Sequence, residues 1–508
     1  MADAALLTQK QTDTTTAYAR LEAHFGMLNA LSGVGSILHW DAAVIMPETA
    51  AEVRGEQLAA LRQVMHEKTV APQIEDWINA AEAEQSSLES WQQANLREMR
   101  RAYTHATALD SALVRELALA SSQSEAAWRS ARRDNDFVGF LPYFKRVVAA
   151  ARNEAQAKAD ALSLAPYDAL MDGYDPDTRM EEVDVLFARL NDFLPDFREK
   201  VMTHQQKNLD AKLITGSYPT EKQRQLSETF MHALGFKGRL DVSTHPFCGG
   251  VPGDVRITTR YNEKDFVDAL QGVLHETGHA LYEQNLPDIW RNQPVGHARG
   301  MSAHESQSLL VEMQLCRSRE FLRYAAPYIN EALGEGSPDD LSAENLYRVG
   351  VRVKPDYIRV RADEVTYPSH VIMRYELEKD IINGALDVAD LPEAWNAKMQ
   401  EKLGITPPSD TLGCMQDIHW PSGSFGYFPT YTIGAMMAAQ WFAALKRDIP
   451  EWGAQVEKGD FAQISHWLKR NIHEKASSVS RQQMLVEGTG EALNVDIYLQ
   501  HLHDRYMS

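Results

Sequence analysis

Two histidines four residues apart, His275 and His279, enclose a glutamate in the segment HETGH. On a helix, residues four apart lie on one face, so both imidazoles can reach one ion. Glu276 then projects about 100° away, beside the ion rather than onto it. A carboxylate in that position can take a proton from a metal-activated water. The segment therefore predicts a hydrolytic metal centre.

A zinc ion held by two histidines needs a third protein ligand and keeps a fourth position for water. The metzincin pattern requires Gly and His at positions 282 and 285, where this chain has Tyr282 and Asn285, so that class is excluded. A glutamate from a following helix is the other solution. Glu305 and Glu312 lie on a segment with helical spacing, and spacing alone does not choose between them.

The helix that carries HETGH is expected to begin near Asn262, which can cap it, and to stop before Pro287. Upstream, residues 238–260 alternate β-branched and polar residues around several glycines, which predicts a short hairpin or small sheet. Most of residues 1–235 has helical periodicity, clearest in 50–68 and 140–162. The stretch 164–178 is interpreted as turns between helices.

The composition is that of an ordinary globular protein, with 44% hydrophobic and 24% charged residues among 508. We expect a mostly α-helical single domain with a minor β element. The formal net charge of −20 argues against nucleic acid, because binding phosphates requires a basic face. It also disfavours anionic membrane surfaces.

Three scattered cysteines, Cys248, Cys316 and Cys414, are too few for a disulfide framework and predict buried free thiols in a reducing cytoplasm. The first twenty residues contain no basic region followed by an apolar run, so no signal peptide is expected. The most apolar long stretch, YTIGAMMAAQWFAALK, is too short for a membrane span and contains Gln440.

Several short motifs occur in a characteristic order along the chain. They are HPF (245–247), DVRIT (254–258), HETGH (275–279), HESQ (304–307), IRVRAD (358–363) and GCMQDIHW (413–420). In this set the chain resembles the carboxypeptidase Taq family of zinc metallocarboxypeptidases. The stretches 39–61 and 425–435 also look like that family, so the resemblance covers essentially the whole chain.

The resemblance implies one helical domain over residues 1–508, with the metal at the bottom of a long substrate groove. Residues 1–235 are expected to cover the groove, and residues 236–508 to bind metal and substrate. Glu305 is implied as the third zinc ligand with His275 and His279, which leaves Glu312 a supporting role. Cobalt or manganese can substitute for zinc.

Members of the family typically form homodimers and release amino acids one at a time from peptide C-termini with broad specificity. Peptides with a free C-terminus are therefore the expected substrates of this chain. Recognition of the free carboxylate needs a fixed cation, and arginine suits it because its planar fork makes two parallel hydrogen bonds. Arg359 is the candidate, with Arg361 as its competitor.

Three further residues near the C-terminal motifs are candidates for the reaction itself. His419 can donate to the substrate carboxylate or steady the tetrahedral intermediate. Asp417 can orient a histidine through its ring N–H. His419 and Asp417 can each instead be a polar residue with a purely structural role. Tyr431 is a candidate donor to the oxyanion, although a core tyrosine with a bonded hydroxyl fits its sequence nearly as well.

The remaining two motifs are interpreted mainly as groove architecture, with substrate binding secondary. His245 precedes a proline, so its backbone is expected to be extended and to close one wall of the groove. Asp254 and Arg256 lie two apart on an expected strand and therefore face the same side, where they can form an ion pair.

Two other functions fit parts of the pattern. A zinc aminopeptidase or oligoendopeptidase also uses H-E-x-x-H with a downstream glutamate, but an aminopeptidase requires acidic residues for the substrate amine rather than Arg359. A helical peptide-binding scaffold with an inert metal site is the non-enzymatic alternative. Glu276 argues against it, because a structural zinc has no need of that base.

Overall fold

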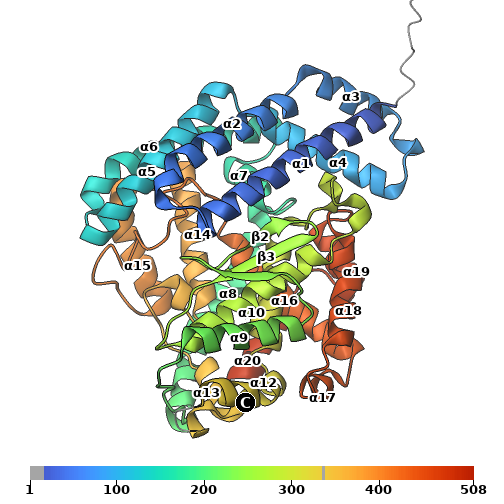
Figure 1. The fold of residues 1–508 in the computed structure, drawn as a ribbon. Helices are drawn as coiled ribbons and strands as arrows, with labels where there is room; N and C mark the ends of the chain where they lie inside the picture. Colours follow the sequence, from blue (N-terminus) through green and yellow to red (C-terminus); the bar gives the residue numbers. More distant parts are fainter. Residues whose placement is uncertain (1–15, 335–337, 508) are drawn as a thin grey trace, which may run out of the picture.

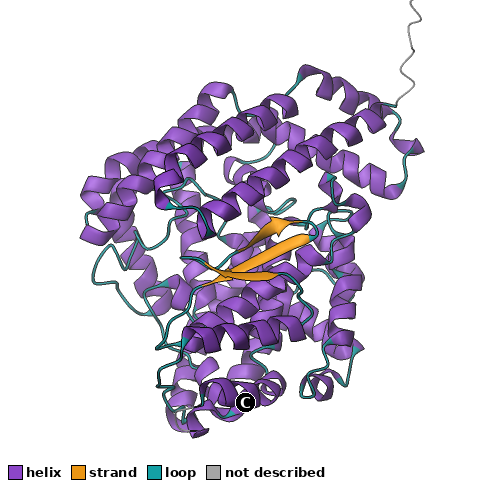
Figure 2. Ribbon diagram, in the orientation of Figure 1, coloured by secondary structure: helices purple, strands orange, loops and turns teal. Residues whose placement is uncertain are grey.

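The computed structural model describes residues 16–334 and 338–507 of the chain. It is built almost entirely from α-helices, as expected, with one small sheet (Figures 1 and 2). The first nine helices are α1 (Ala17–Val44), α2 (Ala51–Thr69), α3 (Pro72–Ala83), α4 (Ser90–Thr107), α5 (Ser111–Asp134), α6 (Phe137–Leu162), α7 (Pro166–Tyr174), α8 (Met180–Asn208) and α9 (Thr220–Ala233).

The blue helices α1 to α4 lie together at one end of the molecule (Figure 1). Helices α1, α3 and α4 share a small hydrophobic core of their own, which includes Leu21, Ile78 and Met99. Helices α8 and α9, in contrast, contact the later helices of the main body. The separate core is thus confined to the first part of residues 1–235, and a division of function at residue 235 stays a prediction.

The sheet confirms the β element expected within 238–260. Its strands are β1 (Arg239–Val242), β2 (Cys248–Val251) and β3 (Asp254–Thr259), in the order β1-β3-β2. Strands β2 and β3 form an antiparallel hairpin, and β1 runs parallel to β3. Strand β2 contacts α1, and both β2 and β3 contact the helix that follows them (Figure 2).

The second half of the chain forms the main body. Its helices are α10 (Phe266–Gln284), α11 (Gly300–Leu309), α12 (Arg319–Leu333), α13 (Ala343–Gly350), α14 (Tyr367–Asn383), α15 (Leu391–Leu403), α16 (Pro429–Asp448), α17 (Trp452–Val456), α18 (Ala462–Asn471), α19 (Arg481–Thr489) and α20 (Val495–Tyr506). A single large core runs through this body and includes most of α16, of whose 20 residues 14 are buried.

Two local predictions are wrong. Residues 164–178 contain a helix, α7, because Pro166 suits a first helical turn and Tyr167, Leu170 and Met171 bury its apolar face. The helix with HETGH begins at Phe266 rather than near Asn262. Asp265 is its cap, and Asn262 accepts a hydrogen bond from the backbone N–H of Lys264 in the preceding turn.

None of the helices in the described residues combines the length and the apolar character that crossing a bilayer requires. Cys316 and Cys414 are buried and Cys248 is half-buried, and all three are free thiols. Residues 1–15, on which the expectation of no signal peptide partly rests, lie outside the described residues.

Candidate metal centre

Helix α10 carries HETGH across the centre of the main body. The carboxylate of Asp265 accepts hydrogen bonds from the backbone N–H groups of Val267 and Asp268, which satisfies two of the free donors at the helix start. On one face of α10, Phe266, Val273, Leu274 and Leu281 are buried, while Leu270 is half-buried. The opposite face presents the two histidines.

Helix α11 brings Glu305 to this face by close helix packing. It crosses α10 at Gly278 and α16 at Gly434, and a Cβ at Gly434 would lie 2.8 Å from the Cβ of Glu305. After Leu309 the helix widens into a π turn, Leu310–Leu315, which carries Glu312. Such turns are rare and frequently occur at functional sites.

The ligand atoms of His275, His279 and Glu305 all lie within 4.8 Å of one another. The Nε2 atom of His275 is 3.8 Å from one carboxylate oxygen of Glu305, and the Nε2 atom of His279 is 3.5 Å from the other. Two imidazoles and a carboxylate form a suitable donor set for zinc or a similar divalent ion. Among the described residues this is the only such cluster of three or more histidine, cysteine or acidic ligands.

Glu305 and Glu312, the two candidates for the third ligand, have different positions relative to His275. Glu312 accepts a hydrogen bond from Nδ1–H of His275 at 2.9 Å and one from Arg317 at 2.6 Å. This leaves the Nε2 atom of His275 free for a metal ion. Although burial opposes protonation, Glu305 and the neighbouring carboxylates raise the pKa of His275 to about 10. Burial instead lowers the pKa of His279 to about 4, so this ring is neutral near pH 7, as a metal ligand must be.

Glu276 lies beside the three ligand residues with its side chain buried. Burial raises the pKa of Glu276 to about 7, while the neighbouring His275 acts in the opposite direction. A carboxyl group with a pKa near neutrality can accept a proton and return it within one reaction cycle.

Sequence reasoning missed the partner of His279. The Nδ1 atom of His279 lies 2.5 Å from Nδ1 of His304, and Nε2 of His304 lies 2.8 Å from a carboxylate oxygen of Glu283. Glu283 could have been found from the sequence, because it follows His279 by four residues on the same helix face. His304 comes from α11, and no local pattern links it to His279.

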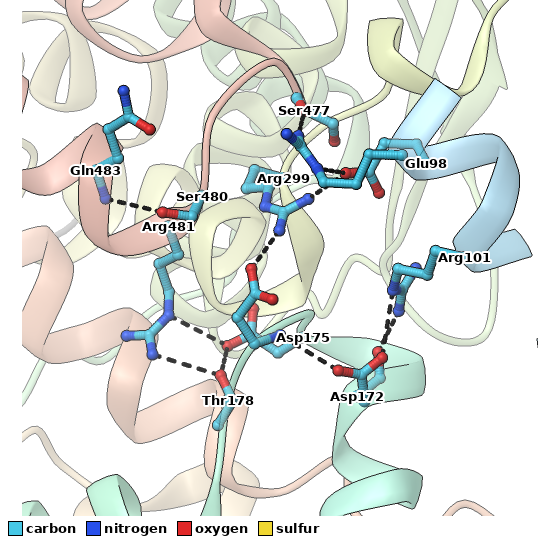
Figure 3. Close-up of polar contacts among 12 residues, drawn as sticks. Glu98, Arg101, Asp172, Asp175, Thr178, Arg299, Ser477, Ser480, Arg481 and Gln483 are labelled. Atoms are coloured by element: carbon cyan, nitrogen blue, oxygen red, sulfur yellow. Dashed lines mark hydrogen bonds and ion pairs between the residues drawn. The ribbon is translucent and has the colours of Figure 1, made fainter. Parts of the chain in front are cut away.

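The start of α11 is held by a buried ionic network (Figure 3). Arg299, 3% exposed, donates to Glu98 of α4 at 2.9 Å and to Asp177 at 2.6 Å. The hydroxyl of Ser302 donates to Asp175, which also faces Arg481 of α19 at 3.5 Å. Helix α11 is thereby fixed to both the N-terminal helices and the C-terminal part of the chain.

Arg359 is buried, whereas Arg361 is exposed, so only Arg359 faces the interior. Its guanidinium donates to Asp417 at 2.8 Å and to the hydroxyl of Tyr367 at 2.7 Å. Arg374 donates to the other oxygen of Asp417 at 2.7 Å. Burial alone would raise the pKa of Asp417, but the two arginines hold it well below its usual range.

Asp417 therefore pairs with two arginines instead of orienting a histidine, as the alternative of a satisfied structural residue predicts. Two guanidinium groups and one carboxylate give this buried cluster a net charge of +1. The ring of Tyr431 lies 5.0 Å from the guanidinium carbon of Arg359. Nε2 of His419 lies 3.3 Å from the hydroxyl of Tyr431. Burial lowers the pKa of His419 to about 4, so this ring is neutral near pH 7.

The remaining candidates lie on the sheet side. His245 is exposed in the connection between β1 and β2. The hydroxyl of Thr258, in the DVRIT motif, accepts a hydrogen bond from the backbone N–H of Phe247, in the HPF motif. Arg256 forms the expected ion pair with Asp254 at 2.5 Å. Its guanidinium carbon also lies 5.6 Å from the ring centre of Trp40 on α1. A substrate-binding role for His245 or Arg256 stays a prediction.

A cavity of about 1010 Å³ lies between α1 and the helices α10 and α11, which carry the candidate metal ligands. Its walls include residues of α1, the β2–β3 turn, the end of α10 and the start of α11. Glu283 and His304 are part of this lining, so the cavity borders the support of His279.

These features together are those of a helical metal-dependent hydrolase: two histidines and a glutamate converge on one point, a buried carboxylate lies beside them, and a large cavity is adjacent. A sequence profile of the carboxypeptidase Taq (M32) metallopeptidases matches residues 20–506. The chain belongs to this family.

Individual relatives agree over nearly the whole chain. Thermostable carboxypeptidase 1 of Thermus thermophilus is 38% identical over 490 residues, which covers 94% of this chain and 95% of the relative. Carboxypeptidase 1 of Bacillus subtilis is 35% identical and covers 93% and 94%, respectively. The structure of metallocarboxypeptidase 1 of Trypanosoma cruzi has a TM-score of 0.95 at 39% identity and covers 97% of this chain and 99% of that one.

The expectations of a helical fold and a metallocarboxypeptidase are confirmed by these comparisons. The chain is a peptide hydrolase that acts on peptide substrates. Family membership favours a carboxypeptidase over the aminopeptidase, oligoendopeptidase and scaffold alternatives.

Proposed function

We propose that this metallocarboxypeptidase uses zinc held by His275, His279 and Glu305 to release amino acids one at a time from free peptide C-termini. The observation that carries the proposal is the convergence of the three ligand atoms within 4.8 Å. Zinc supplies Lewis-acid polarisation of the scissile carbonyl and lowers the pKa of a bound water to about 7. Cobalt or manganese can occupy the same donor set.

Glu276 is the proposed general base. It takes a proton from the attacking water and later delivers it to the leaving amine. A pKa near 7 suits both steps, because the group must be deprotonated before the attack and protonated after it. Its buried position keeps bulk water away from the proton while it is held.

The free carboxylate of the substrate is proposed to bind near Arg359. The net charge of +1 on Arg359, Arg374 and Asp417 favours an anion there. His419 and Tyr431 belong to the same aromatic group and are proposed to donate hydrogen bonds to the substrate. The cavity between α1 and α11 is then part of the expected long groove, on the side of the metal centre where Glu283 lies.

The cellular location and the oligomeric state are also part of the proposal. Cytoplasmic location rests on three cysteines that form no disulfide. A homodimer rests on the resemblance to the family, and analytical ultracentrifugation tests it.

The activity is tested with two peptides of the same sequence, one a free acid and one C-terminally amidated. Metal-loaded protein should release single residues from the free acid, as a ladder in timed mass spectra, and should cleave the amide far more slowly. Equal rates on the two peptides, or fragments from internal cleavage, would contradict the proposal.

A further inference from the structure

The two metal-binding histidines are supported in different ways. Nδ1–H of His275 meets the carboxylate of Glu312 directly, and Arg317 neutralises that carboxylate. Behind His279, a second imidazole stands between the ligand and a carboxylate, in the order His279, His304, Glu283.

A bound ion would determine where the protons lie in the series His279, His304 and Glu283. If Nε2 of His279 binds the ion, its Nδ1 carries the proton and donates it to Nδ1 of His304. His304 must then be neutral and carry its own proton on Nε2, which donates to Glu283. The proton of His279 is then accepted by His304, and the proton of His304 is accepted by the negatively charged carboxylate of Glu283.

The two supports also differ in their exposure. The side chain of Glu312 is 11% exposed, whereas that of Glu283 is 33% exposed and forms part of the cavity wall. Glu312 is held by Arg317, but the only ion pair recorded for Glu283 in the described part of the chain is with His304. The negative charge of Glu283 is therefore directed at the His304 ring.

We infer that His304 and Glu283 are positioning residues for the metal site: they fix the ring of His279 and the tautomer in which its Nε2 binds zinc. This rests on the metal site proposed above. Because the carboxylate of Glu283 accepts a hydrogen bond from His304, we expect its effect on His279 to pass mainly through His304. Outer partners of metal-binding histidines typically change metal affinity by 10- to 100-fold.

The test is a titration of metal-free protein with Zn²⁺ in competition with a chromophoric chelator. His304→Ala should weaken zinc binding by about 10- to 100-fold. His304→Gln should recover part of the loss, because its amide oxygen can accept the proton of His279 Nδ1. Glu283→Gln should cause a smaller loss, because it keeps an acceptor but removes the charge. Met301→Leu, on the same cavity wall, is the matched control and should bind zinc like the wild type.

Double variants separate positioning from general damage. The pair His304→Ala with Glu283→Gln should bind zinc no more weakly than His304→Ala alone, since the two residues act in series. The pair His304→Ala with Glu312→Gln should show the product of the two single effects, because Glu312 supports the other histidine. Multiplicative losses in the first pair, or wild-type zinc affinity in His304→Ala, would overturn the inference.

Folding and the metal site itself are checked separately. Thermal unfolding of the metal-free variants shows whether they fold, and if His304→Ala does not, unchanged zinc affinity in Glu283→Gln contradicts the inference. Tight zinc binding by His275→Ala would instead refute the proposed metal site, and would leave no role for either support.

Discussion

The carbonyl oxygen of Gln307 occupies the space where a side chain on Gly278 would begin: a Cβ there would lie 2.4 Å from that oxygen. The Cα of Ser308 would be 2.5 Å away. The glycine of HETGH is therefore what allows α11 to lie directly on α10. Glu305 lies on α11 only two residues before this contact.

Gly278→Ala should push α11 away from α10 and move Glu305 from the two histidines. We expect a loss of about 1–3 kcal/mol in the free energy of unfolding, typical of overpacking, together with weaker zinc binding. Gly272→Ala, on the same helix, is the control, since its nearest neighbours would be 3.7 and 3.8 Å from a new Cβ. Chelator competition measures zinc binding, and equal affinities in the two variants would contradict this account of helix packing.

Arg359 and Arg361 can be separated by matched lysine variants. Arg359→Lys keeps the charge but loses the planar fork, so kcat/KM for a free-acid peptide should fall at least about tenfold. Arg361→Lys should have no effect, because Arg361 is exposed. Steady-state kinetics on free-acid and amidated peptides measure the difference. The reverse ranking of the two variants would show that the carboxylate site lies elsewhere.

The protein should lose stability in acid through buried carboxylates paired with cations. Burial alone would raise the pKa of Glu364, but Arg505 and His501 hold it well below its usual range, as Arg359 and Arg374 do for Asp417. The stabilisation that Glu364 and Asp417 contribute is complete above about pH 4, the pKa of these groups in the unfolded chain. It is lost as the pH falls from there toward their lower pKa values in the folded protein.

The midpoint of thermal unfolding, measured from pH 7 to pH 3, checks this prediction. Glu364→Gln should lower the midpoint at pH 7 and flatten its fall below pH 4. Glu116→Gln, which removes an exposed ion pair with Arg146, should leave the profile nearly unchanged. A wild-type midpoint that stays constant down to pH 3 would be the contrary result.

Glu378 should have the opposite pH dependence. It is fully buried and accepts hydrogen bonds from Tyr167, Trp420 and the backbone of Gly426. Burial raises its pKa to about 7, so its folded form holds a proton that the unfolded chain has released. Its stabilising contribution is present below about pH 4.5 and is lost as pH rises through 7, a change of about 3 kcal/mol.

Glu378→Gln should remove most of this loss of stability between pH 5 and pH 8. Glu376→Gln is the control on the same helix, because Lys398 and Lys402 lower the pKa of Glu376 despite its partial burial. Chemical unfolding at several pH values measures the difference. The prediction fails if Glu378→Gln keeps the wild-type slope in this range.

The sequence predicts the parts of this protein that depend on local spacing. Helical periodicity identifies α2 and α6, and the four-residue spacing of His275 and His279 predicts that both imidazoles lie on one face of a helix. Local signals fail where two nearby residues compete, as Asn262 and Asp265 do for the cap of α10. They also fail at α7, because its proline, glycine and aspartates are typical of a turn although the segment is helical.

The rest of the site depends on tertiary contacts that no spacing reveals. Glu305 and Glu312 are seven residues apart and fit one helix face, yet one meets both Nε2 atoms and the other meets Nδ1 of His275. Asp417 pairs with Arg359 and Arg374, which come from two other segments of the chain. Only the arrangement of the helices in space determines these partners.

The central claim is that Glu276 performs the proton transfers at a metal site built by other residues. Glu276→Gln should bind one zinc ion per chain with unchanged affinity, while kcat on a free-acid peptide falls by about 10²- to 10⁴-fold. Zinc content and turnover are measured on the same preparation. A variant with full zinc content and near-normal kcat would contradict the account.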